Sequence, residues 1–361
     1  MRLSLDDVHH LHAGALFNAP AVDHAWCAEE VARVLAHMEQ YGEAPELLPV
    51  ESLDPDDLVV SIGYVNKGHP IAELRPVGDE FVRCVELIEA SLGQQVAGVM
   101  PLAAGNVNAI SPLLPAIRLG LPVIDADPMG RIFPLVDQTV FTLKGLSVGP
   151  VAAVGALGES ALFDVERPAR GDKLLRAAAD EFGGWAASAT YPMTASTLAE
   201  SGVIGSLSRL IRIGRILNLP LETDEKYDAL RRSEGVKQII RTRIGDTAWA
   251  SQPARVGRNQ RTDSVVLLEN SQGRLVQLEV EDELLMLLVD GSVRAAVPDI
   301  ITMLQPEENR VAELSDLWAG NSIDIVVMRA AEPWYTPEGM ALAGPSAFGL
   351  LTGTAGKDAG R

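Results

Sequence analysis

The chain has 361 residues, which is enough for about two domains with well-buried cores. Its composition, 47% hydrophobic and 22% charged, excludes a disordered chain, and its net charge of −19 disfavours partners such as nucleic acid or anionic lipid. Two cysteines are too few for a multi-cysteine metal site. The sequence has no apolar run of about 18 residues and no apolar signal core, so we expect no membrane partner and a cytoplasmic protein.

Predicted helices and strands alternate through the first half of the chain. Apolar residues at helical spacing mark the helices, and continuous apolar runs mark buried strands. In chain order we predict a helix over 28–41, a strand over 58–64, a helix over 80–92, a strand over 96–100, a short helix after Ser111–Pro112 and a strand over 122–127. This order favours parallel pairing with right-handed crossovers. We therefore predict an α/β layered N-terminal domain with parallel strands over residues 1–165.

The pattern changes from residue 166 onward. Helical spacing covers 173–181, 196–217 and 224–234, and Gly214 within the second of these favours close helix packing over helix stability. Short β runs follow, and Asp290–Gly291 is typical of a two-residue hairpin. The prediction for 166–361 is a β-rich, barrel-like C-terminal domain with a helical insertion near 173–234.

Polar residues gather in three loops that follow the predicted strands. In parallel α/β sheets, ligands bind outside the carboxyl ends of the strands, which is where these loops begin. The loops cover 64–73, 101–111 and 125–131, and they carry His69, Glu73, Asn106, Asn108, Asp125, Asp127 and Arg131. The sequence has neither a phosphate-cradling loop nor a dinucleotide fingerprint, so no nucleotide cofactor is expected.

Asp125 and Asp127 are the strongest candidates for catalysis. Two residues apart in an extended strand, they point to one face, where their repulsion calls for a cation, a shared proton or an arginine. One interpretation is a divalent metal site for zinc or manganese with His69, and another is an acid/base pair facing His69 and Glu73. For Asp127, an ordinary turn with Pro128 fits equally well.

The amides and the arginine also allow two interpretations each. Asn106 and Asn108 either bind a carbonyl-rich substrate or form a tight loop after Gly105. Arg131 either holds a substrate carboxylate or pairs with one of the two aspartates.

All six histidines lie in the first fifth of the chain, so any histidine chemistry originates there. His9, His10 and His12 suggest a metal cluster at first sight. Neighbouring histidines point in different directions, however, and N-terminal segments are often mobile. We therefore expect surface histidines.

The longest distinctive segment is PLAAGNVNAISPLLPAIRLGLPVIDADPMGRIFP at 101–134, accompanied by KGHPIAELRP at 67–76 and EDELLMLLVDGSVRAAVPDIITML at 281–304. With these segments the chain resembles the hydantoinase-like family named after S-methyl thiohydantoin desulfurase. The resemblance implies an α/β domain joined to a β-barrel-like domain. It also implies attack on a five-membered cyclic ureide or thioureide that releases a sulfur leaving group, and relatives act on thiohydantoin propionates. A metal-activated water suits this reaction.

From the loops and the resemblance together we expect a hydrolase-like enzyme that acts on a small cyclic ureide. Asp125, Asp127, His69 and Glu73 would then be the catalytic or metal-binding groups, with Asn106, Asn108 and Arg131 for the substrate. Enzymes of this size are often homo-oligomers, so we expect self-association.

Two departures from the family pattern keep other functions open. Family members usually carry a Gly-rich stretch near the N-terminus, where this chain has HAGALFNAPAV, and a glutamate where it has Ala103. The alternatives are a non-catalytic relative and a subunit of a hydantoinase or oxoprolinase assembly.

Overall fold

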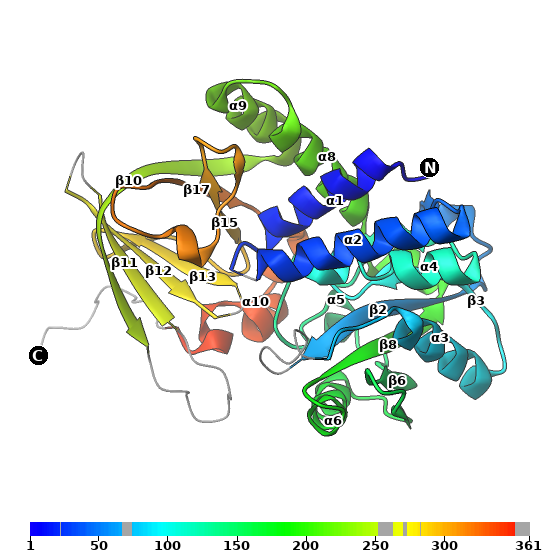
Figure 1. Cartoon of the computed structure of the whole chain (residues 1–361). Coiled ribbons are helices and arrows are strands. Elements are labelled where there is room, and N and C mark those ends of the chain that lie inside the picture. Colours follow the sequence, from blue (N-terminus) through cyan, green and yellow to red (C-terminus); the bar gives the residue numbers. More distant parts are fainter. Residues whose placement is uncertain (22, 67–73, 252–262, 270–272, 282, 351–361) are drawn as a thin grey trace, which may run out of the picture.

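The computed structural model shows two large β-sheets with helices packed around them (Figure 1). It describes residues 1–350 except 22, 67–73, 252–262, 270–272 and 282. The helices are α1 (Leu5–Asn18), α2 (His24–Tyr41), α3 (Asp79–Leu92), α4 (Leu113–Leu119), α5 (Val140–Leu143), α6 (Pro168–Glu181), α7 (Ala195–Ser201), α8 (Ser206–Asn218), α9 (Thr223–Glu234) and α10 (Pro337–Ala343).

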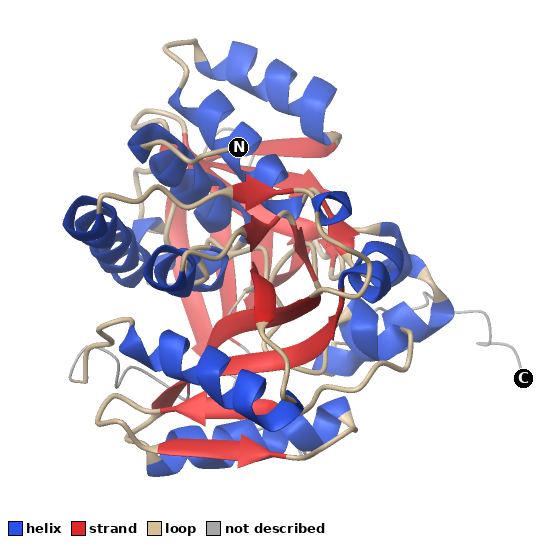
Figure 2. Cartoon of the chain, turned by 90° about the vertical axis from the view of Figure 1, so that its right-hand side faces the viewer, coloured by secondary structure: helices blue, strands red, loops and turns tan. Residues whose placement is uncertain are grey.

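The first sheet has seven strands in the order β1-β4-β3-β2-β8-β6-β7. Its members are β1 (Leu47–Leu48), β2 (Leu58–Asn66), β3 (Val96–Pro101), β4 (Val123–Ile124), β6 (Val151–Val154), β7 (Ser160–Phe163) and β8 (Trp185–Thr194). Strands β1, β4, β3 and β2 run parallel, as the sequence predicted, whereas β8 is antiparallel to β2. The sheet is therefore mixed, and β8 extends it beyond residue 165. Helices lie on both sides of its strands (Figure 2).

The second sheet has eight antiparallel strands in the order β14-β13-β12-β11-β10-β17-β15-β16. They are β10 (Val236–Ser251), β11 (Asp263–Glu269), β12 (Leu275–Val280), β13 (Leu284–Val289), β14 (Ser292–Ala296), β15 (Ile300–Gln305), β16 (Arg310–Val311) and β17 (Ser322–Met328). Long strand β10 pairs with β17 before residue 244 and with β11 from there on, with a bulge next to Ile244. The bulge bends the sheet around its own apolar core. Closure into a barrel was a wrong prediction, because β14 and β16 end the sheet without pairing to each other.

Two predicted elements are interrupted in the structure. The helix predicted over 196–217 is split into α7 and α8 by β9 (Val203–Ile204), where Gly205 adopts a positive φ of 77°. The strand predicted over 122–127 is split at Asp125 into β4 and β5 (Ala126–Asp127), and β5 pairs with β9. In both cases a short antiparallel pair replaces a longer regular element.

Helices α1 and α8 cross at two glycines. A Cβ on Gly14 would overlap the carbonyl group of Leu210, and a Cβ on Gly214 would overlap that of His10. The close packing predicted at Gly214 is therefore confirmed, because only glycine lets the two backbones approach this closely.

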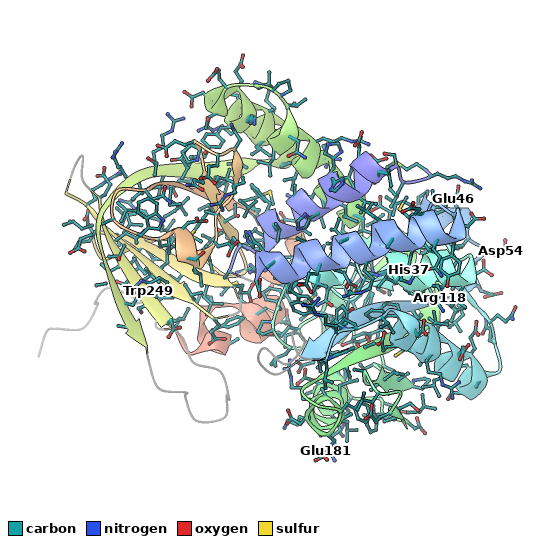
Figure 3. The ribbon with its side chains drawn as sticks, viewed as in Figure 1. His37, Glu46, Asp54, Arg118, Glu181 and Trp249 are labelled. Atoms are coloured by element: carbon teal, nitrogen blue, oxygen red, sulfur yellow. The ribbon has the colours of Figure 1, made fainter. Side chains whose placement is uncertain are left out.

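Helix α2 packs against α4 at the outer surface, where Figure 3 shows His37 and Arg118. The Tyr41 ring connects the two, stacking on His37 at 5.9 Å between centroids and lying 5.3 Å from the Arg118 guanidinium carbon. None of the helices in the described part of the chain has the length and apolar character needed to cross a membrane.

Candidate functional site

The carboxyl ends of β2, β3 and β4 meet at one edge of the first sheet, as predicted from the strand order. Asn108 follows β3, and its side-chain oxygen accepts a 2.7 Å hydrogen bond from the Tyr64 N–H on β2. Asn106 has a positive φ of 44°, and its side-chain oxygen accepts from the Asn108 N–H at 2.8 Å. Both amides are buried, and these bonds fasten the loop after β3 to β2.

Asp127 is fully buried in the same region. Its carboxylate accepts backbone N–H bonds from Ala104 at 3.0 Å, Met129 at 2.8 Å and Gly130 at 2.8 Å. Burial raises the pKa of Asp127 to about 7, against the opposing effect of these N–H donors. The Asp127 carboxylate therefore connects the loop after β3 to the turn that follows β5. With this pKa, its proton titrates near neutral pH.

Asp125 caps helix α8 from outside the helix. Its carboxylate accepts the N–H groups of Leu207 at 2.9 Å and Ser208 at 3.0 Å, and the Ser208 hydroxyl at 2.5 Å. Free N–H groups and the positive end of the helix dipole favour a carboxylate at this position. The two aspartates thus have separate partners.

Arg131 binds neither aspartate, so the predicted pairing was wrong. Its guanidinium forms a buried ion pair with Glu283, which directly precedes β13 of the second sheet, and donates to the carbonyl oxygens of Pro298 at 2.6 Å and Asp299 at 2.8 Å. The side chain is 2% exposed, which leaves it out of reach of a substrate carboxylate. Arg131 joins the loop after β5 to the second sheet.

Three buried polar groups near this edge were missed in the sequence. Asn18 of α1 donates to the Ala104 carbonyl at 2.8 Å, and Tyr64 donates from its hydroxyl to Glu30 of α2 at 3.1 Å. Glu30 has no exposed surface and also pairs with Arg33. Helical spacing from Cys27 places Glu30 on the buried face of α2, so a charged residue at a core position was the available signal.

His69 and Glu73 lie outside the described residues, and their predicted roles stay predictions. Within the described part of the chain, no group of three His, Cys, Asp or Glu side chains could hold a metal ion. The oxygens of Asp125 and Asp127 are already engaged by N–H and O–H donors. The described residues alone therefore do not form the predicted zinc or manganese site.

The expectation of surface histidines was wrong for His12. Burial, together with neighbouring His24 and His9, lowers the pKa of His12 to about 4. His24 is also partly buried, with its Nδ1 3.5 Å from the Glu313 carboxylate. Both imidazoles lie where the N-terminal helices meet the second half of the chain, and His12 is neutral at pH 7.

Two family models together cover residues 10–354. The S-Me-THD-like N-terminal domain matches residues 10–165, and the S-Me-THD-like C-terminal domain matches residues 166–354. The chain belongs to the S-Me-THD-like family. This confirms the resemblance that the segment at 101–134 suggested.

One solved structure gives independent support for the fold. The X-ray structure of a structural genomics target from Chromobacterium violaceum is 22% identical, with a TM-score of 0.72 and 92% of each chain covered. At this identity the likeness shows the fold alone. No curated protein matches the chain.

Proposed function

We propose that the protein is an enzyme that hydrolyses an S-methylated thiohydantoin or a related cyclic ureide at the carboxyl ends of β2, β3 and β4. Membership of the S-Me-THD-like family over nearly the whole chain carries this proposal. The convergence of buried polar groups at the strand ends supports the location, because ligands of parallel sheets bind there.

The proposed reaction replaces sulfur by oxygen on one ring carbon. A water oxygen forms a bond to that carbon, the C–S bond breaks, and the departing methanethiolate takes up one of the two water protons. The other proton ends on the ring nitrogen that was double-bonded to this carbon, which leaves a ring carbonyl beside an N–H group. One group must remove a proton from water and another must supply a proton to sulfur. We assign these roles to His69 and Glu73, which follow β2 in the sequence.

Asp127 has a positioning role in this proposal. Its N–H bonds fix the loops after β3 and β5 relative to one another, and its pKa of about 7 makes that clamp sensitive to pH in the working range. Asn108 fixes the loop after β3 to β2 through Tyr64.

Release of methanethiol from an S-methylated thiohydantoin, followed with a thiol reagent, tests the proposal. We expect turnover by the natural chain and a loss of roughly 10²–10⁴-fold in kcat/KM for His69→Gln and for Glu73→Gln. His9→Gln is the matched control, since His9 is exposed, and should retain full activity. Equal activity in all three variants would remove both residues from the mechanism.

A non-catalytic role is the second candidate function. It is favoured by the hydrogen bonds that Asp125 and Asp127 already accept within the protein. Their oxygens bind backbone N–H groups and a serine hydroxyl, which is how structural carboxylates are used. A folded natural chain that binds the thiohydantoin without turning it over would establish this second candidate. Turnover would exclude it.

A further inference from the structure

A cavity of about 420 Å³ lies in the second half of the chain, between the first turn of α9 and strands β10, β11 and β17. It opens where β10 changes its pairing from β17 to β11. The volume falls within the range of roughly 300–1,000 Å³ that small-molecule sites occupy. No residue of the strand-end site lines this cavity, so its function can be argued independently.

The cavity contains one arginine that is neutralised and one that is available. In the pairing of β10 with β17, Arg241 lies opposite Asp324 and Arg243 lies opposite Ser322. Arg241 binds the Asp224 carboxylate and lies 4.0 Å from Asp324. The exposed Arg243 side chain forms no hydrogen bond or ion pair with any residue that the structure describes. Its guanidinium is free to take a carboxylate in a bidentate fashion.

The opposite charge comes from a buried aspartate in the same cavity. Asp324 is 4% exposed and accepts a 2.7 Å hydrogen bond from the Tyr227 hydroxyl. Burial raises the pKa of Asp324, which means that its present partners do not fully compensate the charged form. A cationic donor at this carboxylate would supply the missing compensation.

We propose that this cavity binds a free amino acid in its zwitterionic form, with the carboxylate on Arg243 and the ammonium group on Asp324. A single cation would leave Arg243 unmatched, and a single anion would lie beside the Asp324 carboxylate. The register places Arg243 diagonally across from Asp324 on one face of the sheet, so a small molecule with both charges fits both residues.

Calorimetric titration of the full chain with each of the twenty amino acids tests this proposal. We expect at least one to bind, and Arg243→Gln to weaken its binding roughly 10–100-fold, as expected for the loss of a charge-assisted hydrogen bond. Arg294→Gln is the control, since Arg294 is an exposed arginine on β14 of the same sheet and outside the cavity. That variant should bind with unchanged affinity.

Two analogues of the bound amino acid complete the test: the amine that lacks its carboxylate and the carboxylic acid that lacks its amino group. Each keeps only one of the two charges, so each should bind at least tenfold more weakly than the zwitterion. Asp324→Asn should weaken the zwitterion as well, with circular dichroism confirming that this buried variant is folded. The proposal is overturned if no amino acid binds, if Arg243→Gln binds as tightly as the natural chain, or if the amine alone binds as well as the amino acid.

Discussion

Removing the Glu283 carboxylate should destabilise the protein strongly, because the charged guanidinium of Arg131 would remain buried without a negative partner and without access to water. Arg131 lies in the loop after β5 and Glu283 directly precedes β13 of the second sheet, and each side chain is 2% exposed. Arg131 also donates to the carbonyl oxygens of Ile132, Pro298 and Asp299. In Glu283→Leu these carbonyls remain as acceptors, but the compensating negative charge is lost.

The expected cost follows from the energetics of buried ion pairs. Breaking such a pair by removing one partner costs about 3–5 kcal/mol, because the remaining charge is uncompensated. Replacing both partners by apolar side chains is often close to neutral. In Arg131→Met with Glu283→Leu, however, the Ile132, Pro298 and Asp299 carbonyls also lose donors, at about 1 kcal/mol each. We therefore expect about 3–5 kcal/mol for Glu283→Leu and about 3 kcal/mol for the double variant, which stays no more costly than the single one although it removes two side chains.

Urea unfolding monitored by tryptophan fluorescence measures both costs. Trp334 donates its indole N–H to the Met129 carbonyl at 2.7 Å and lies close to the affected loop, which makes it a suitable reporter. Glu332→Leu removes an exposed partner of Arg329 and serves as the control, with an expected cost under about 1 kcal/mol. A cost for Glu283→Leu no larger than for Glu332→Leu would refute this account of the pair.

Three other substitutions probe separate parts of the fold. Gly214→Ala places a methyl group against the His10 carbonyl, so we expect a cost of about 3 kcal/mol or more in thermal unfolding, and an unchanged Tm would contradict the packing described for α1 and α8. Asp125→Ala leaves the first N–H groups of α8 uncapped and should cost about 1–2 kcal/mol, whereas a cost near zero would mean that water replaces the cap. The pKa of His12 falls from 6.5 to about 4 on folding, so acidification across this window protonates the unfolded state first and removes about 3 kcal/mol of stability. In His12→Gln this pH dependence should disappear from urea titrations, and an identical profile would show that His12 is not its origin.

The sequence predicted the N-terminal layers well because their signals are local. The helix over 80–92, the strand over 58–64 and the short helix after Ser111–Pro112 each depend on neighbouring residues, and all three occur in the structure. The second sheet contains the expected hairpin at Asp290–Gly291, with positive φ at both positions. The sequence could not predict that this sheet stays open, because closure into a barrel depends on whether its two edge strands form hydrogen bonds with each other.

The location of the candidate site was predictable, but the partners of its residues were not. Strand ends can be counted from the sequence: Asn108 follows β3, Asp127 is the last residue of β5, and Arg131 follows β5. Arg131 nevertheless pairs with a residue 152 positions away, at Glu283. Contacts of this separation depend on how two sheets pack, for which a single sequence carries no periodic signal.

Asp127 shows why the same residue pattern supports both a structural and a functional interpretation. Its turn with Pro128 and Gly130 supplies backbone N–H donors, as the structural interpretation requires. An acid with a folded pKa near 7 and an unfolded value of 3.8 destabilises the fold as pH rises from about 4 to about 7, because the folded state retains a proton that the unfolded state releases. Both carboxylate oxygens accept backbone N–H groups, and an asparagine, with a single side-chain oxygen, could accept only part of them. The clamp alone therefore gives a structural reason for an aspartate here. A buried acid with a pKa near 7 is also typical of active sites, so the structural and the functional interpretation both lead to the same residue at this strand end.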